Sequence, residues 1–230
     1  MRTLRRSEVR KLASERLKVI KPLCEEALGR RINGDITIRV HTRFVSSFLA
    51  NVWYPTKKAL FPKPDSFSDD VLSRALTPFA APFLFAARGL AGILSSEFRP
   101  MAGYAVTGEN VILLISSSSV LSRAKELDYF LAHELTHLLT DDAEQIPGSF
   151  GLAIYEGLAT YYGEKVAQRL YPDLNVLDTI EKRPIYVNGY LLMRAIEEKT
   201  GRDPLQVLMS LPHDSFDEPT IFLKNLFVYT

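Results

Sequence analysis

The chain has 230 residues, 47% of them hydrophobic, which suffices for one globular domain with a sizeable core. Its formal net charge of +1 disfavours a nucleic-acid partner, since nucleic-acid-binding proteins usually carry a clear basic excess. Cys24, the single cysteine, has no partner for an internal disulfide, and residues 1–20 lack the apolar core of a signal peptide. We therefore expect a cytoplasmic protein.

The N-terminal residues predict a helix followed by a strand. Apolar positions recur at helical spacing over residues 3–28, and Gly29 is a typical helix end. Pro22 is expected to kink this helix or to split it in two. Apolar and polar residues then alternate over Asp35–His41, which indicates a half-buried strand.

Residues 55–69 contain three prolines and are expected to form a loop. Helix is expected to follow from about residue 71 to 96. The most apolar region, Leu76–Leu94, contains two prolines, two glycines and an arginine. A membrane span needs about 20 consecutive apolar residues, so buried helices are a better interpretation and a membrane partner is not expected.

The rest of the sequence predicts a hairpin followed by helices. Two short apolar runs in residues 103–116 flank a Thr-Gly-Glu-Asn turn, which predicts a β-hairpin. Helices are expected at 122–140, 150–170, 187–199 and 204–211, with a last one opening at Pro219. We expect residues 101–230 to form the core, and residues 1–100 to be an N-terminal region that packs on it or covers it.

The segment Leu131–Asp142, LAHELTHLLTDD, contains the pattern HExxH as His133, Glu134 and His137. Residues four apart on a helix share a face, so both imidazoles can bind one metal ion. Glu134 lies one position round from His133, where it can reach a metal-bound water. The flanking residues are apolar, and burying three such polar groups without a partner would be costly. We therefore predict one zinc ion per chain.

A tetrahedral catalytic zinc site has three protein ligands and one open position. Glu156 is the best candidate for the third ligand, since eighteen residues separate it from His137. A loop around Pro147-Gly148 would let a second helix pack on the first and present this carboxylate. The other two histidines, His41 and His213, do not lie at a recognised ligand spacing.

HExxH followed by eighteen residues and a glutamate resembles the pattern of gluzincin metallopeptidases. The segment YEGLATY, Tyr155–Tyr161, is similar to the N-E-G-F-A-x-Y of aminopeptidase N-type enzymes, although no G-A-M-E-N-type segment is present. The compact minigluzincins are closer in size. The resemblance covers about Gly103–Leu211. It implies an α+β, zincin-like fold: a small mixed sheet with an edge strand over the HExxH helix, and helical parts at both ends.

A second match lies downstream, where Tyr186-Val187-Asn188-Gly189 is similar to the Y-x-K-G segment of the aminopeptidase group. In that group the tyrosine stabilises the reaction oxyanion, so the resemblance implies a catalytic role for Tyr186. Tyr190 and His213 are alternatives. Tyr190 falls inside the expected helix, where packing explains it equally well, and a surface-loop position explains His213.

The resemblance implies a zinc-dependent metallopeptidase that hydrolyses peptide bonds with a zinc-bound water activated by Glu134. Zincins bind an extended peptide along a sheet edge. The candidate substrate-binding residues are therefore Gly103 and Tyr104, or the run Val111–Ile115, although either run could be an ordinary strand. The expected partner is a peptide or protein substrate.

Several other residues have weaker claims. Thr160, one helical turn after the candidate glutamate ligand, could orient a ligand imidazole, and so could Asp141 or Asp142. Cys24 is either a small core residue or a blocker of the zinc site in a latent form. The alternative function is accordingly a latent or non-catalytic gluzincin-fold protein with a binding or regulatory role, its cleft covered by residues 1–100 or by the C-terminal segment.

Overall fold

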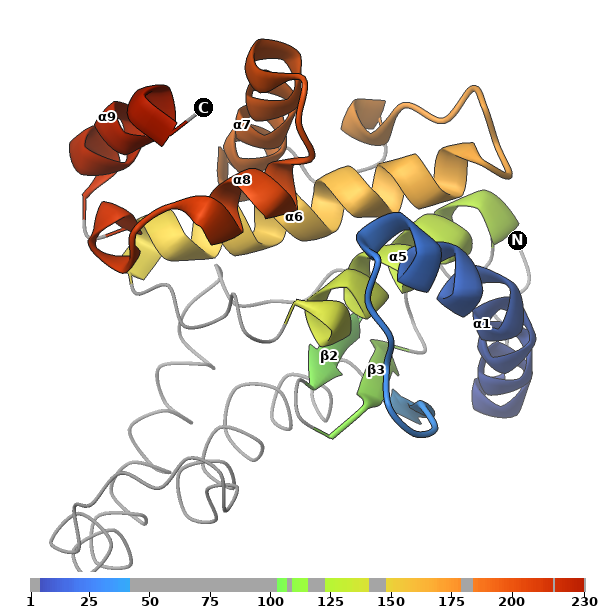
Figure 1. Ribbon diagram of the computed structural model, residues 1–230. Coiled ribbons are helices and arrows are strands. Elements are labelled where there is room, and N and C mark those ends of the chain that lie inside the picture. The colour runs from blue at the N-terminus through green and yellow to red at the C-terminus, as the bar shows by residue number, and fades with distance from the viewer. Residues whose placement is uncertain are drawn as a thin grey trace, which may run out of the picture.

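The computed structural model shows a mostly helical protein with one small mixed sheet (Figure 1). It describes residues 5–41, 103–106, 109–115, 123–140, 148–178, 184–216 and 218–229. The expected loop at 55–69, the expected helices at about 71–96 and the two aspartates Asp141 and Asp142 lie outside these residues. The described residues are mostly helical with one three-stranded mixed sheet, and the α+β, zincin-like assignment stays a prediction.

Helix α1, Arg6–Leu28, confirms the expected N-terminal helix. It ends where Gly29 adopts a left-handed conformation, with φ 62°, and its N–H bonds to the last carbonyls. The helix continues through Pro22, so the expected split does not occur. Ile20 and Cys24 on either side of this proline are fully buried, and their packing compensates for the missing backbone hydrogen bond.

The sheet contains strands β1 (Thr37–His41), β2 (Gly103–Val106) and β3 (Val111–Ile115) in the order β1-β3-β2. β2 and β3 pair antiparallel, which confirms the predicted hairpin, and β1 runs parallel to β3. Every residue of β3 is buried. Since β1 pairs with β3, the N-terminal part of the chain contributes a strand to the same sheet. The expected domain boundary at residue 100 falls outside the described residues.

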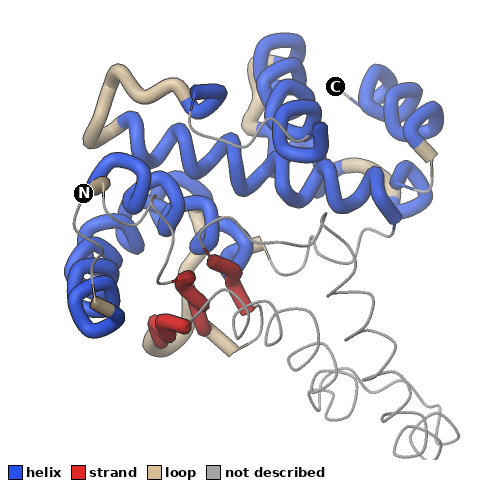
Figure 2. The backbone as a smooth tube through the Cα atoms, turned by 180° about the vertical axis from the view of Figure 1, so that it is seen from behind, coloured by secondary structure: helices blue, strands red, loops and turns tan. Residues whose placement is uncertain are grey.

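The remaining helices form further layers. The expected helices are confirmed as α5 (Ala124–Leu139), α6 (Gly148–Gln168), α7 (Pro184–Thr200), α8 (Pro204–Ser210) and α9 (Pro219–Tyr229), with 3-10 helices at Val176–Asp178 and His213–Phe216. The sheet lies on one side of α5 and the long α6 on the other, with α7 beyond it (Figures 1 and 2). Asp203 caps α8 by accepting from the N–H groups of Leu205 and Gln206.

Two apolar clusters hold these layers together. One joins α1, the sheet and α5, and the other joins α6, α7 and α8. The helices that carry the HExxH pattern and Glu156 are thus packed from both sides, which fixes their relative positions. Among the described residues, no helix is both long and apolar enough to cross a membrane, and Leu76–Leu94 lies outside them.

Candidate metal centre

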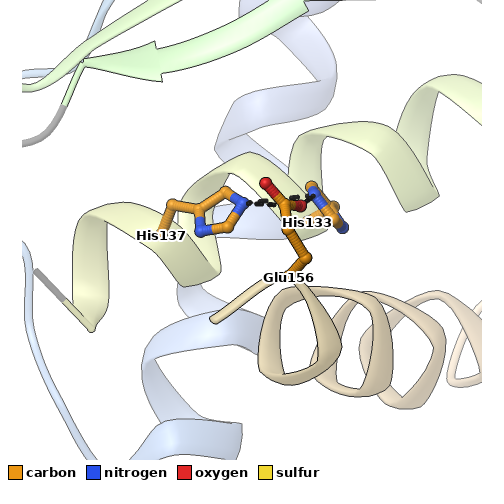
Figure 3. Close-up of side chains that lie close together, drawn as sticks. All are labelled: His133, His137 and Glu156. Atoms are coloured by element: carbon orange, nitrogen blue, oxygen red, sulfur yellow. Dashed lines mark hydrogen bonds and ion pairs between the residues drawn. The ribbon is translucent and has the colours of Figure 1, made fainter. Parts of the chain in front are cut away.

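The HExxH residues lie on α5 in buried surroundings. Their exposed fractions are 8% for His133, 5% for Glu134 and 6% for His137. Leu131 and Leu135, at intermediate positions along the helix, are fully buried in the cluster shared with α1 and the sheet. This apolar face packs α5 against α1 and the sheet. The two histidines project from α5 toward α6 (Figure 3).

Glu156 points from α6 to the space between the two imidazoles (Figure 3). Its Oε2 lies 3.2 Å from Nε2 of His133 and 3.5 Å from Nε2 of His137. The two Nε2 atoms are 3.2 Å apart. Three possible ligand atoms from two helices therefore lie close together.

These separations fit a tetrahedral metal ion. Ligand atoms about 2.0–2.1 Å from a tetrahedral zinc ion would lie about 3.3 Å from one another. The Glu156 Oε2 atom is buried and has no hydrogen-bond donor among the described residues, so a cation would satisfy it. Burial alone would raise the pKa of Glu156, but His137 and His133 lower it far below its ordinary value. The carboxylate is thus in its metal-binding form.

A glycine permits the close approach of α5 and α6. A Cβ atom at Gly163 would lie 3.0 Å from the Tyr129 ring and 3.3 Å from the backbone nitrogen of His133. The two helices therefore contact each other near His133, and Glu156 lies two turns earlier on α6, where its carboxylate reaches both histidines. A larger residue at position 163 would crowd the Tyr129 ring and the backbone of His133.

Glu134 interacts both with strand β2 and with the candidate metal ligands. The backbone N–H of Ala105, on β2, donates to its carboxylate. Burial raises the pKa of Glu134 to about 7, and the nearby Glu156 carboxylate contributes to the rise. His133 and the Ala105 N–H oppose this shift. The carboxyl group thus lies between the edge strand and the histidines, where it can hold or release a proton.

Tyr186 also lies beside the cluster. Its ring centroid is 6.1 Å from that of His133. The start of α7, which carries this tyrosine, is brought close by a backbone contact between Gly157 and Gly189. Tyr186 is half-buried.

Tyr190, one of the alternatives to Tyr186, has other surroundings. The Tyr190 hydroxyl donates to the buried Glu164 carboxylate over 2.5 Å and accepts from Arg194 over 3.2 Å. Glu164 also accepts from the N–H of Val176, so this group ties α6 and α7 to the following loop. His213 opens the 3-10 helix His213–Phe216. A structural role thus accounts for Tyr190.

The remaining sequence candidates are placed as follows. Gly103 packs tightly, because a Cβ atom there would lie 2.8 Å from the Phe130 ring, and the neighbouring Tyr104 is 38% exposed. Thr160 is fully buried, but neither ligand imidazole has a hydrogen-bond partner for its Nδ1 atom among the described residues. The role of Thr160 in orienting a ligand imidazole stays a prediction. Cys24 is a core residue, with its thiol 3.9 Å from the Ala132 carbonyl oxygen.

Sequence reasoning missed two neighbours of the histidines. The Tyr155 ring lies 4.2 Å from the His137 ring at an interplanar angle of 36°, and its hydroxyl is 3.4 Å from the His137 carbonyl oxygen. Tyr129 lies 6.1 Å from the His133 ring. Tyr129 precedes His133 by one helical turn, which is a detectable signal. Tyr155 had no such signal, because its contact crosses between helices.

Comparisons of the chain with protein-family models, with curated proteins and with solved structures found no match.

Proposed function

We propose that the protein is a zinc-dependent metallopeptidase of the gluzincin type. His133, His137 and Glu156 would hold the ion. The observation that carries this proposal is the convergence of their three donor atoms at separations of 3.2, 3.2 and 3.5 Å, which fit the edges of a tetrahedron around zinc. Two imidazoles and one carboxylate are a donor set of known catalytic zinc sites.

A bound zinc ion supplies Lewis-acid chemistry, because it polarises a carbonyl oxygen and lowers the pKa of water. Glu134, buried at 5% exposure next to the histidines, acts as the general base and then as the general acid. It takes a proton from the attacking water and gives it to the leaving amine. The Ala105 N–H holds its carboxylate in place.

Tyr186 donates its hydroxyl proton in a hydrogen bond to the oxyanion that forms on the scissile carbonyl. Its position supports this role, since its ring lies 6.1 Å from the His133 ring on the first turn of α7. The substrate would lie extended along β2, the end strand of the sheet. Gly103 and Tyr104 belong to that strand, two residues and one residue before Ala105, whose N–H bonds Glu134.

The test is the hydrolysis of unstructured peptides by zinc-loaded protein, followed by mass spectrometry. Glu134→Gln should retain zinc and lose about 10²–10⁴-fold in cleavage rate, because it keeps the shape but not the base. Cleavage by Glu134→Gln at the wild-type rate would contradict the proposal. Tyr104→Ala, on the strand, should raise KM more than it lowers kcat.

The low exposure of Glu134, 5%, also favours a second candidate: a latent or non-catalytic protein of the same type that binds rather than cleaves. The same experiment distinguishes the two. Zinc-loaded wild-type protein that binds an unstructured peptide but leaves it intact over long incubation would support the second candidate against the first.

A further inference from the structure

A basic groove lies between the first half of α1 and strand β1, and it shares no residue with the candidate metal centre. We call it the α1/β1 groove. On the helix side, three basic residues and two serines line it: Arg6, Arg10, Lys11, Ser7 and Ser14. On the other side it is lined by all five residues of β1, Thr37–His41.

The lining shows that the groove runs along the outer edge of β1. Side chains alternate between the two faces of a sheet, so a groove on one face would contact every second residue. This groove contacts five consecutive residues. The helical residues recur at positions 6, 7, 10, 11 and 14, which share one face of α1.

Among the described residues, the outer edge of β1 has no strand partner, so the backbone groups on that edge can pair with a bound ligand. The Thr37 N–H donates to the Asn110 carbonyl oxygen over 2.8 Å, on the side of β3. Backbone groups of consecutive strand residues point to opposite edges, so those of Ile38 and Val40 face outward. Among the described residues no strand pairs with β1 on that side. Such an edge is a template for an added strand.

The groove is also strongly positive. Arg6, Arg10, Lys11 and Arg39 line it, and none of the described residues that line it is an aspartate or glutamate. Burial lowers the pKa of His41, and the charges of Arg39 and Arg6 lower it further, as expected where cations gather. The His41 Nε2 atom is buried and has no hydrogen-bond partner in the described part of the chain.

We propose that the α1/β1 groove binds an acidic peptide segment in extended conformation, which pairs with the edge of β1 and sets its carboxylates beside the arginines. An anion such as a nucleic-acid phosphate would use the charges and leave the outward N–H and C=O groups of Ile38 and Val40 unpaired. An extended acidic peptide uses both. Five strand residues span about 16 Å, which a segment of about five peptide residues matches.

The binding test uses the full chain and fluorescence anisotropy with a labelled eight-residue peptide of alternating Glu and Val. This peptide should bind with an affinity that falls as salt rises. The same peptide with alternate backbone N-methyl groups cannot add to a strand edge and should bind about tenfold or more weakly. Equal binding of both peptides would overturn the proposal, and so would preferential binding of a single-stranded oligonucleotide to the groove.

Variants locate the site. Arg6→Glu with Arg10→Glu should weaken binding of the Glu/Val peptide about tenfold or more, since it reverses two of the cations. Lys18→Glu with Lys199→Glu changes the net charge equally at exposed positions outside the groove, and should leave the affinity within about twofold. Equal weakening by the two pairs would show non-specific attraction and overturn the proposal.

A third variant tests the strand edge. Val40→Pro removes one outward N–H without removing a bond to β3, and should weaken peptide binding. Hydrogen exchange of the unmodified protein gives the same information without a substitution. The Ile38 and Val40 amides should become protected when the peptide binds, and amides that remain unprotected in the bound state would overturn the proposal.

Discussion

Gly157 of α6 and Gly189 of α7 hold two helix backbones in direct contact. A Cβ atom at Gly157 would lie 2.4 Å from the Gly189 carbonyl, and one at Gly189 would lie 2.1 Å from the Ala153 carbonyl oxygen. No side chain fits at either position. Because Gly157 follows Glu156 and Gly189 lies one turn after Tyr186, this contact brings the candidate ligand and the candidate oxyanion donor together.

Gly189→Ala should therefore destabilise the protein and disturb the centre. We expect a loss of about 1–3 kcal/mol, because backbone atoms rather than a flexible side chain oppose the new methyl group. Each kcal/mol corresponds to about 2–4 °C in Tm for a chain of this length. Zinc affinity should also fall as α6 shifts. Thermal unfolding and a zinc titration measure both effects.

Asn188→Ala is the matched control for this glycine. Asn188 is the preceding residue on the same helix and is exposed. Its replacement should change stability by no more than about 0.5 kcal/mol. If Gly189→Ala were as stable as Asn188→Ala, the close helix contact would be wrong.

The Arg16–Asp128 ion pair joins α1 to α5. Asp128 is fully buried, accepts from the Arg16 Nε over 2.7 Å and from the Tyr171 hydroxyl over 2.8 Å, and pairs with the Arg16 Nη2. Arg16→Met would leave a buried carboxylate with one donor and should cost about 3 kcal/mol. Denaturant unfolding measures this loss.

The two partners differ in exposure, so their substitutions should differ in cost. The Arg16 side chain is 28% exposed and keeps contact with water when its partner is removed. Asp128→Asn should therefore cost less than Arg16→Met. The double variant Arg16→Met with Asp128→Leu should recover most of the loss, because an apolar pair replaces a buried ion pair at little cost. A reversed order of the two single variants would contradict this account.

Cys24 should be inert to thiol reagents in the folded protein. Burial raises the pKa of its thiol far above the ordinary value of 9.0, with a smaller contribution from Glu25. The native protein should resist iodoacetamide at pH 8, and the denatured protein should react at once. Rapid labelling of native protein at pH 8 would contradict the burial of this residue.

The same shift has a consequence for stability. Burial raises the pKa of Cys24 in the folded protein above its value in the unfolded chain, which is near 9. The protonated thiol therefore contributes fully to the free energy of unfolding below pH 9, and this contribution is lost as the pH rises further. The free energy of unfolding should fall above pH 9 by up to about 1.4 kcal/mol per unit from this thiol. Cys24→Ala should show a shallower decline over that range in denaturant unfolding at several pH values.

Substitutions at Tyr186 and Tyr190 should have different effects, the first on catalysis and the second on stability. Tyr186→Phe removes the proposed oxyanion donor and should lower kcat by about 10²-fold while zinc content and Tm stay unchanged. Tyr190→Phe removes the buried hydrogen bond to Glu164 and should lower stability by about 1–2 kcal/mol with a smaller effect on kcat. A larger loss of kcat in Tyr190→Phe would reverse the assignment.

Local chemistry explains which elements could be predicted from the sequence. Gly29 ends α1 and Asp203 begins α8 because caps depend on neighbouring residues only. The hairpin turn is local too, with Asn110 in the left-handed conformation at φ 51°. The sequence indicated Glu156 as a candidate third ligand through its spacing of eighteen residues from His137, which is similar to the gluzincin pattern.

The contacts that surround these residues depend on tertiary packing and could not be predicted. Every residue except proline carries a backbone N–H, so nothing in the sequence marked Ala105 as the donor to Glu134. The helix through Pro22 persists because buried neighbours outweigh the lost hydrogen bond. Glu164 gave no sequence signal, because its partners Val176 and Tyr190 lie on other segments.

Zinc affinity tests the central claim most directly. Equilibrium competition with a chelator should give one tightly bound zinc ion per wild-type chain. His137→Ala and Glu156→Gln should each weaken binding about 10²-fold or more, because each removes one of three ligands. Glu134→Gln should retain wild-type affinity. Zinc binding that is absent in the wild type, or that is unchanged in both ligand variants, would contradict the account.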